Sequence, residues 1–539
     1  MKRVLFISAL LFLIASSQAQ NEILPVKSSN TILFAKDVKM NSDTTKDQRN
    51  VVVCSAFNGW LYAAYTYIHR ESNQDFGAFV ISKSTDSGVT WDIIFDAFYP
   101  NADSRFTCID ILAIGSEADS LKILIATVLS NDISGIGDPM VLKYNGNTGI
   151  CEDGLLIDNY TSFIAIASDY GYPAVNSNPF SIGVLYSKST QYRDSIIFCS
   201  SSNGGMTLDN RRVLATTVNR FQKVALSHGR SASKNSGRYF AVWEEKNAYN
   251  SSTGHIYTSH SEPNFNSPFT APVRLDSIDP SAYNNARNPV IACQANNIDN
   301  DSSNLTEVIL YDKYKASTNC YVVRGLVNRK ATVSTHFTPF TLPLSSDFQK
   351  QPSVIFNPYD STFLTTYYDS SAQKLPLLKS NFNLGNPNLW QIITPWYNDS
   401  SNLADPYPKV RLDHGMHQAM NVWNSEGSSG KGVALFDAPY STYTGIHEIF
   451  MNPKSMLKGV FPNPASDRTT ILFELKEKAV VSINLYSMEG ILLKQTGNEE
   501  YAAGRQSINL NVSDLPPGTY LFNFTAGDFN SKGKIIVIK

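Results

Sequence analysis

Three arginines are the first residues in this sequence whose type and position could do chemistry. Arg105, Arg220 and Arg287 each stand just before a strand-length apolar run, and Tyr283 lies close to the third. A guanidinium group is a permanently charged fork of hydrogen-bond donors, which suits recognition of a carboxylate. The same arginines could instead anchor the loops that lead into strands or face solvent, and the sequence favours this second interpretation.

Two polar and aromatic segments offer a different chemistry. They are residues 394–399 (TPWYND), which include Trp396 and Tyr397, and residues 279–284 (DPSAYN). Exposed aromatic rings beside Asn and Asp suit sugar binding, because the rings stack on the sugar while the polar groups form hydrogen bonds. These segments equally suit packing of the loops against their own strands, so both interpretations stay open.

Two other pairs of residues are weaker candidates for a metal or catalytic site. His414 and His417 lie three apart in DHGMH, but SHG at 227–229 occupies the same place in its own repeat, which indicates a turn rather than a metal site. Glu244 and Glu245 are adjacent in a strand-like run and should point to opposite faces, so they are a poor acid and base pair. No phosphate-binding, dinucleotide or nucleophile-elbow motif is present. We therefore expect neither a metal nor a cofactor.

Repeated strands must position these residues. Seven apolar, aromatic runs recur at intervals of 56 to 67 residues, beginning at Trp60, Leu121, Phe180, Arg238, Leu305, Ser361 and His417. A shorter apolar strand precedes each run, and a third strand, a turn and a weaker fourth strand follow it. Such a unit predicts a β-propeller blade, since one small sheet cannot bury both faces alone but a ring of sheets can. We predict an all-β, seven-bladed propeller, with six or eight blades as alternatives, and the aromatic runs packed between blades.

A segment near the N-terminus could close this ring. Residues 31–38 (TILFAKDV) read as a further strand, which could pair with the last blade and remove an exposed edge.

One turn carries a recognisable motif. Residues 84–91 (STDSGVTW) fit S-x-D-x-G-x-T-W, and 201–208 (SSNGGMTL) are a degenerate copy. The motif resembles the Asp-box of sialidase-like propellers. Asp86 can bond backbone N–H groups of its own hairpin, Gly88 supplies an unusual φ, and Trp91 can pack between strands, with Ser84 opening the motif. It is a folding device, found also in non-enzymatic propellers.

The sialidase-like resemblance implies a ligand site on the opposite face. Sialidases use an arginine cluster for the substrate carboxylate, a Tyr nucleophile supported by Glu, and an Asp acid/base. The resemblance makes Arg105, Arg220, Arg287 and Tyr283 candidate ligand-binding residues, and residues 286–289 (ARNP) resemble the family's R-I-P segment with Asn in place of Ile. A complete Tyr–Glu–Asp set is missing, and seven blades depart from the family's six. The catalytic residues are therefore left unassigned.

The N-terminus predicts export. Lys2 and Arg3 precede an apolar stretch from Val4 to Ala15, and residues 17–19 (SQA) form a small-x-small cleavage site. This pattern is typical of a secretory signal peptide, because the stretch is too short to span a bilayer. No later run is long and apolar enough to cross a membrane. The six scattered cysteines show no metal spacing, and most lie in apolar strand-like runs, so buried free thiols are expected.

The last 80 or so residues carry a second resemblance. They begin with FPNPASD (461–467), continue with a strand–MEG turn–strand hairpin at residues 486–493 and an LPPGTY block at 515–520, and end in a basic strand at Lys539. Together these features resemble the type A C-terminal sorting domain of the type IX secretion system of Bacteroidetes. The alternating strands predict a small Ig-like β-sandwich. The resemblance implies export through the type IX machinery, removal of the domain near residues 451–460, and release or surface attachment of the cargo.

Composition limits the remaining function classes. Charged residues make up only 17% and the net charge is −2, which excludes a nucleic-acid binder with a basic stripe. We expect a signal peptide at 1–19, a propeller at 20–455 and a sorting domain at 456–539. The favoured function is binding of a glycan or a protein partner by a secreted or cell-surface propeller. A sialidase-like glycoside hydrolase and a structural or adhesion component are the alternatives.

Overall fold

The computed structural model describes residues 37–538 of the chain. It leaves out residues 42, 44, 116–120, 133, 169–180, 231–236, 248–252, 263–267, 279–284, 296–304, 332–335, 344–347, 381–389, 395, 400–402, 404, 428–429, 439–456, 462–464, 476–477, 488–490, 498 and 528. The predicted signal peptide, Tyr283 and most of the predicted cleavage segment therefore lie outside the described residues. The chain divides into two compact units, Met1–Tyr440 and Ser441–Lys539. Within the described residues, no helix is long and apolar enough to cross a membrane.

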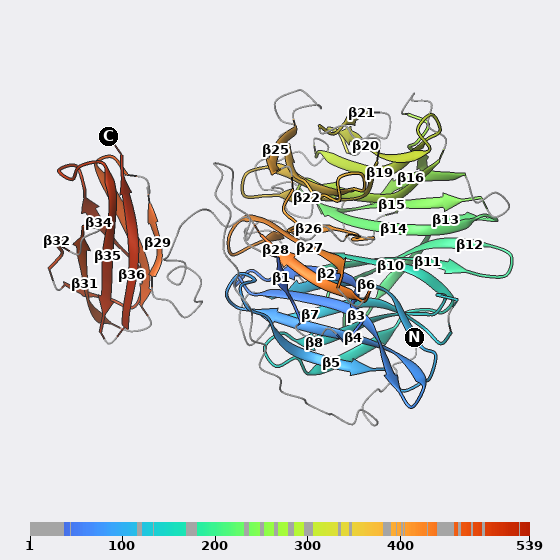
Figure 1. The fold of residues 1–539 in the computed structure, drawn as a ribbon, viewed down its shortest axis with the longest axis horizontal. Coiled ribbons are helices and arrows are strands. Elements are labelled where there is room, and N and C mark those ends of the chain that lie inside the picture. Colours follow the sequence, from blue (N-terminus) through green and yellow to red (C-terminus); the bar gives the residue numbers. More distant parts are fainter. Residues whose placement is uncertain are drawn as a thin grey trace. The chain divides into compact units, whose positions relative to one another are not determined.

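The first unit contains seven four-stranded sheets (Figure 1). The first three are β2 (Arg49–Ser55), β3 (Leu61–Glu71), β4 (Gln74–Ser84) and β5 (Asp92–Phe98); β6 (Arg105–Ile114), β7 (Lys122–Ser130), β8 (Asp138–Asn145) and β9 (Cys151–Leu156); and β10 (Thr161–Ser168), β11 (Ile182–Ser189), β12 (Asp194–Ser201) and β13 (Asp209–Thr217). The next two are β14 (Arg220–Gly229), β15 (Arg238–Lys246), β16 (Gly254–His260) and β17 (Val273–Arg274); and β18 (Ala286–Cys293), β19 (Glu307–Lys315), β20 (Cys320–Asn328) and β21 (Phe337–Thr341). The sixth is β22 (Gln349–Asn357), β23 (Thr362–Asp369), β24 (Leu377–Ser380) and β25 (Trp390–Thr394), and the seventh is β26 (Lys409–Asp413), β27 (Gln418–Glu426), β28 (Gly432–Asp437) and β1 (Val38–Lys39).

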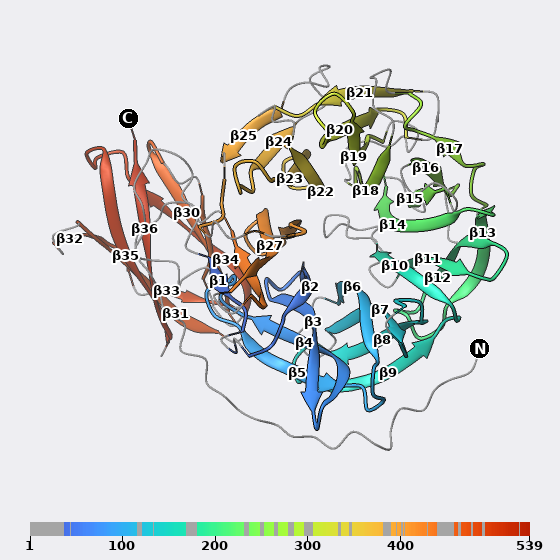
Figure 2. The same cartoon turned by 45° about the vertical axis from the view of Figure 1, so that its right-hand side comes forward.

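These sheets form the ring of a β-propeller. Within each sheet, strands that follow one another in the chain pair antiparallel, and the first strand lies nearest the middle of the ring (Figure 2). Neighbouring first strands contact one another around the ring, as β10 does with β6 and β14. The residues at the start of seven separate strands are therefore brought to one central opening.

The N-terminal segment closes the seventh sheet. β1 supplies its fourth strand, with Val38 opposite Phe436 and Lys39 opposite Leu435. Because the other three strands come from the far end of the ring, this pairing joins the two ends of the propeller. Only the last two residues of the run at 31–38, Asp37 and Val38, belong to the described part of the chain.

The hydrophobic core lies between the sheets, one cluster at each of the seven junctions. The aromatic second strand of each sheet contributes side chains to the core clusters on both sides of that sheet, because side chains alternate between the two faces along a strand. Tyr62 on β3 packs toward the second sheet, whereas Tyr65 packs toward the seventh. Trp243 and Trp423 occupy the same kind of place on β15 and β27 and are fully buried. The aromatic runs thus pack sheet against sheet.

The turn at residues 84–91 joins β4 to β5 and is held by its own side chains. The Asp86 carboxylate accepts hydrogen bonds from the Thr90 backbone N–H at 2.9 Å and the Thr90 hydroxyl at 2.6 Å, and the Ser84 Oγ accepts one from the Gly88 N–H at 2.8 Å. Asn203 takes the place of Asp86 in the second copy and accepts the Thr207 N–H at 3.1 Å. The Trp91 indole N–H donates to the Gly88 carbonyl of the same turn at 3.1 Å, and the Trp91 ring contacts Phe436 of the seventh sheet.

The second unit consists of two sheets. One contains β29 (Leu457–Phe461), β30 (Arg468–Leu475) and β34 (Gly504–Asn511). The other contains β31 (Ala479–Tyr486), β32 (Leu492–Gln495), β33 (Glu499–Tyr501), β35 (Gly518–Ala526) and β36 (Phe529–Val537). One core cluster draws on both, with Ile471 and Phe473 meeting Ile483 and Phe524. Ala465, from the predicted opening segment, exchanges backbone hydrogen bonds of 2.8 and 2.9 Å with Ile536 and Ile538.

All six cysteines lie in strands of the ring and have free thiols. Cys54, Cys199, Cys293 and Cys320 are buried, whereas Cys151 is exposed. Cys108 is half-buried at the central opening.

Candidate functional site

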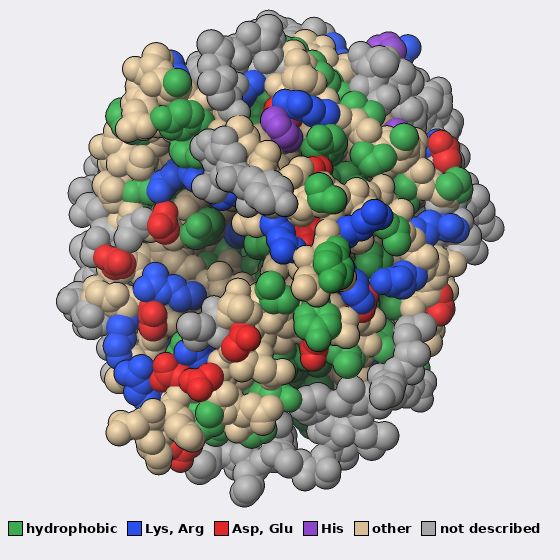
Figure 3. All heavy atoms as spheres, turned by 90° about the vertical axis from the view of Figure 1, so that its right-hand side faces the viewer, with side chains coloured by type: hydrophobic (Ala, Val, Ile, Leu, Met, Phe, Trp, Pro, Cys, Tyr) green, Lys and Arg blue, Asp and Glu red, His purple; other side chains and the backbone are tan. Residues whose placement is uncertain are grey.

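A cavity of about 590 Å³ opens where the first strands begin, and we call it the mouth. Its cationic side chains are Lys223, Lys246, Arg287, Lys350 and Lys409, and its carboxylates are Glu244 and Asp405. Figure 3 shows the face of the ring toward which β15 runs in Figure 1, with groups of Lys and Arg near the middle and scattered Asp and Glu between them.

Bulges at the start of the first strands shape this mouth. The pairing of first and second strands shifts between Arg49 and Val52 in the first sheet, and at the same place in the fifth and sixth sheets. The bulge residues Asn50, Asn288 and Gln351 have left-handed φ values of 53°, 51° and 57°. Asn tolerates this conformation. In the fifth and sixth sheets, the proline after each polar residue has no N–H to lose from the ladder.

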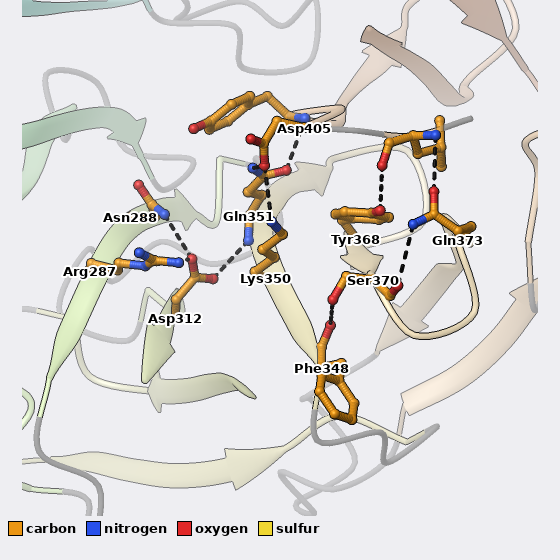
Figure 4. A network of polar contacts seen from close by, with 12 residues as sticks. Arg287, Asn288, Asp312, Phe348, Lys350, Gln351, Tyr368, Ser370, Gln373 and Asp405 are labelled. Carbon is orange, nitrogen blue, oxygen red and sulfur yellow. Dashed lines mark hydrogen bonds and ion pairs between the residues drawn. The ribbon is translucent and has the colours of Figure 1, made fainter. Parts of the chain in front are cut away.

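A buried carboxylate lies beneath the mouth (Figure 4). Asp312 on β19 accepts a hydrogen bond of 2.7 Å from the Asn288 side-chain amide and one of 2.8 Å from the backbone N–H of Gln351. The Arg287 Nε lies 3.6 Å from the same carboxylate. Burial raises the pKa of Asp312 to about 7, against the opposing effect of Asn288 and Arg287. This carboxyl group is therefore partly protonated near neutral pH.

Arg287 reaches the mouth with its guanidinium group held flat. The group lies 3.4 Å from the centre of the Tyr321 ring, and about a third of the Arg287 side chain is exposed. Stacking fixes the plane of the fork, so its donors meet a ligand in a set orientation.

The adjacent wall is built from the sixth sheet, which contacts the fifth, and from the chain that follows it. The Gln351 side chain donates to the Asp405 carboxylate at 3.1 Å and accepts the backbone N–H of Tyr407 at 3.1 Å, and Lys350 pairs with Asp405 at 2.9 Å. Gln373 accepts the Leu403 N–H at 3.0 Å, which anchors the segment from the other side. The Tyr407 ring is left 49% exposed beside the cavity.

Glu244 and Glu245 accept hydrogen bonds from different neighbouring sheets. Glu244 is buried and accepts the Asn288 N–H at 3.0 Å from the next sheet, and burial raises its pKa. Glu245 accepts hydrogen bonds from Thr217 at 2.8 Å and Asn219 at 2.7 Å, on the side of the preceding sheet. The two adjacent carboxylates thus do not form a pair.

The other two candidate arginines lie away from the mouth. Arg105 donates to the Ser104 carbonyl at 2.7 Å and pairs with Asp75 at 3.4 Å. Arg220 pairs with Asp194 at 2.6 Å. Both are the first residue of a first strand, and each is tied to the preceding sheet. Of the three arginines, only Arg287 lines the cavity.

The aromatic candidates separate in the same way. The Trp396 side chain is 50% exposed, with the Lys374 ammonium 4.5 Å from the centre of its ring. Tyr397 is only 2% exposed, bonds the Thr366 hydroxyl at 2.9 Å and packs on Trp423. Of the two interpretations left open for Tyr397, the structure fits packing, because the residue is part of the core between the sixth and seventh sheets. Neither Trp396 nor Tyr397 lines the mouth. Tyr283 and the rest of 279–284 lie outside the described residues.

The two histidines pack around one tyrosine. The Tyr359 hydroxyl lies 3.1 Å from His414 Nδ1, and the His417 ring stacks on Tyr359 at 3.6 Å. Burial lowers the pKa of His414 to about 3. In the part of the chain that the structure describes, no group of three or more His, Cys, Asp or Glu side chains is arranged to hold a metal ion.

Several residues of the mouth escaped sequence reasoning. Asp312 looked like one polar residue in an apolar run, and Lys223 and Lys409 like surface charges. A signal was nevertheless present, since both lysines open matching first-strand runs, KVALSHG and KVRLDHG. Polar residues at the same place in other first strands, including Asn288 and Gln351, complete the pattern.

Comparison with known proteins identifies the second unit. The profile of the secretion system C-terminal sorting domain matches residues 459–539. The chain ends in a type IX sorting domain. The protein is therefore secreted or carried at the cell surface. No curated protein matches the chain.

Solved structures are similar to the ring at low identity. They include an α-L-arabinanase of Penicillium chrysogenum complexed with arabinobiose, with 14% identity, a TM-score of 0.41 and coverage of 75% of this chain and 98% of that one. An α-L-arabinofuranosidase of Fusarium graminearum with an iminosugar inhibitor has 13% identity and a TM-score of 0.39, and the match covers 75% of this chain and 97% of that one. A PL25 ulvan lyase has 10% identity and a TM-score of 0.43, and the match covers 72% of this chain and 93% of that one. Likeness at this level concerns the fold and not the activity.

Proposed function

We propose that this protein is a secreted or cell-surface β-propeller that binds a glycan in the mouth. The observation that carries the proposal is the pairing of a half-exposed aromatic ring, Tyr407, with the flat guanidinium of Arg287 over one cavity. Aromatic faces stack on the apolar faces of sugars, and planar polar groups bond their hydroxyls. A cavity of about 590 Å³ also falls in the size range of small-ligand sites.

Arg287 and Arg220 both lie at the start of a first strand, so substitution of each provides a test of the proposal and a matched control. The full mature chain and two variants, Arg287→Ala and Arg220→Ala, are applied to a glycan array, and the affinity of the best hit is measured by calorimetry. We expect Arg287→Ala to weaken binding about tenfold or more, because a desolvated, oriented donor is lost. Arg220→Ala, which removes an arginine that lies away from the mouth, should bind like the unaltered protein. Equal loss in both variants, or glycan binding by neither the unaltered chain nor the variants, contradicts the proposal.

A glycoside hydrolase is the second candidate, and one observation favours it. Asp312 and Glu244 both lie under the mouth, and both have raised pKa values. A carboxyl group that stays protonated near neutral pH can act as a general acid in glycoside hydrolysis. However, each already accepts a backbone N–H from the next sheet, from Gln351 and Asn288 respectively. This repeated contact ties neighbouring sheets together, so we favour binding without hydrolysis.

Fluorogenic sialosides and arabinosides separate the two candidates. A binding protein leaves them intact at any pH. Turnover that Asp312→Asn abolishes, with the melting temperature retained, supports the hydrolase instead. If no glycan binds while a surface protein copurifies with the ring, the remaining alternative, a structural or adhesion component, is supported.

We also propose the blade count, the turn type, the class of the sorting domain and the domain boundaries. We infer that the seven sheets are seven blades and that the turns at 84–91 and 201–208 are of the Asp-box type, supported by their shared hydrogen bonds. The two-sheet unit fits an Ig-like sandwich and a type A sorting domain. Residues 1–19 serve as the signal peptide, 20–455 as the propeller and 456–539 as the sorting domain, with cleavage near 451–460.

A further inference from the structure

We propose that the narrow end of the mouth binds the carboxylate or sulfate group of an acidic saccharide between the ammonium groups of Lys223 and Lys409. The inference rests on the proposed glycan function and adds the class of glycan. We call this place the throat, because Lys223 and Lys409 line both the mouth and the deeper channel of about 210 Å³.

The fold brings the two lysines together from separate sheets. Lys223 follows the bulge of β14 in the fourth sheet, and Lys409 is the first residue of β26 in the seventh. Burial, together with the charges of Lys223 and Arg411, lowers the pKa of Lys409 to about 7 against the opposing charge of Asp110. The throat therefore concentrates positive charge in a poorly solvated place.

Two acids lie near the lysines, and both are engaged. The Glu244 carboxylate, which interacts electrostatically with Lys223, accepts the Asn288 N–H at 3.0 Å. The Asp110 carboxylate accepts the Ile166 N–H at 3.2 Å and the Ile111 N–H at 3.0 Å, and it pairs with Arg411 at 3.8 Å. The Cys108 thiol donates toward the Ile164 carbonyl at 3.4 Å, and burial raises its pKa, so it stays neutral. None of these groups is available to neutralise both lysines.

The two ammonium groups consequently lack acceptors. Among the described residues, neither the Lys223 nor the Lys409 ammonium group makes a hydrogen bond or ion pair with the protein. Two other cations of the mouth are occupied, since Lys350 pairs with Asp405 and Arg287 lies against Tyr321 and Asp312. An oxyanion offers several acceptor oxygens and a negative charge at once, which offsets the repulsion between the two cations.

The space above the throat indicates what carries the oxyanion. The mouth leaves room for rings attached to the acidic group, and Tyr407 and Arg287 stand there as an aromatic and a planar polar contact. A free inorganic anion would use the throat alone and leave these groups without a ligand. An acidic saccharide uses both.

Calorimetry on the full mature chain tests the inference. The probes are a trigalacturonate, its carboxyl-reduced neutral counterpart, a sulfated galactose tetrasaccharide and sodium sulfate. We expect an acidic probe to bind about tenfold or more tighter than the neutral one. Lys223→Gln and Lys409→Gln should each remove this preference. Lys379→Gln, which removes a lysine paired with Asp360 outside the mouth, is the matched control and should keep the preference.

The outcomes distinguish this inference from the proposed function. Binding of the neutral saccharide with no acidic preference, or a preference that survives both throat substitutions, overturns the inference and leaves glycan binding intact. Sodium sulfate that binds as tightly as the acidic saccharides shows an inorganic anion site and also overturns it. Failure of every saccharide to bind overturns both. Melting temperatures near that of the unaltered chain establish that the variants fold.

Discussion

At the scale of single residues, buried ionisable groups make this ring sensitive to pH. Glu307 is fully buried, and its carboxylate accepts one hydrogen bond of 3.1 Å from the Asn328 amide. Burial raises its pKa to about 8, against the opposing effect of Asn328. Between about pH 4.5, its usual pKa, and pH 8, the folded chain holds a proton that the unfolded chain has lost. Stability should therefore fall as pH rises through this window.

Glu307→Gln removes this titration while keeping the shape and the acceptor for Asn328. We expect the unaltered protein to lose more stability between pH 5 and pH 8 than the variant does, by roughly 1 kcal/mol or more. Thermal unfolding at the two pH values measures the difference. Glu71→Gln, on an exposed hairpin, should follow the unaltered protein. Parallel pH profiles for the Glu307 variant would show that its carboxyl group does not titrate in this way.

Residue roles were the part that the sequence predicted least well. The strand-start position of Arg287 was readable, but Arg105 and Arg220 share that position and are tied to the preceding sheet instead. Which arginine faces the opening depends on the bulge and on the acid supplied by a neighbouring sheet, and both are long-range features. The polar residues around Tyr397 left its exposure undecided, and the structure places it in the core between the sixth and seventh sheets.

At the scale of elements, the sequence was informative because strand patterns are local. The seven aromatic runs coincide with the second strands of the seven sheets, and the shorter runs with the first strands. Period-two alternation also marks β31, where Val481, Ile483 and Leu485 point inward. The bulges were not foreseen, since they depend on how two separate strands pair. Residues 457–461 were read partly as a linker but form β29, which pairs with β30.

The turn between β4 and β5 makes a sharp prediction at this scale. Gly88 has φ of +90°, and a Cβ there would lie 2.0 Å from the Phe436 ring of the seventh sheet. Gly430 has a comparable φ of +72°, with nothing within 4 Å. We expect Gly430→Ala to cost about 1 kcal/mol, from backbone strain alone. Gly88→Ala should cost roughly 3 kcal/mol or more, because the clash adds to the same strain.

Denaturant unfolding of the two variants measures this difference. Similar losses of stability for the two variants would mean that the junction between the first and seventh sheets accommodates the added methyl group without a free-energy cost. That result would contradict the tight packing of the turn against the ring closure.

At the scale of the whole molecule, the chain joins a ring of seven sheets to a separate sorting domain. The C-terminal unit has a core of its own, and its opening segment is bonded to its last strand. The sequence predicted this unit well because its turns and alternating strands all lie within about 80 consecutive residues. The mouth, by contrast, collects residues from nearly the full length of the ring.

Export gives a prediction for the whole chain. Ile483 and Val480 lie on the same strand, but Ile483 is fully buried and Val480 is largely exposed. Ile483→Ser should cost roughly 3–5 kcal/mol and unfold the sorting domain, which keeps the protein inside the cell. Val480→Ser should leave export unchanged. Cell fractionation measures both, and normal export of the Ile483 variant would contradict a need for the folded domain.

The central claim is that a glycan occupies the mouth with its acidic group in the throat. A crystal structure of the mature protein with a bound acidic oligosaccharide tests this claim most directly. We predict sugar density against Tyr407 and Arg287, with a carboxylate or sulfate between Lys223 and Lys409. Density on the outer strands or on the opposite face of the ring, with the mouth holding only solvent, would contradict the account.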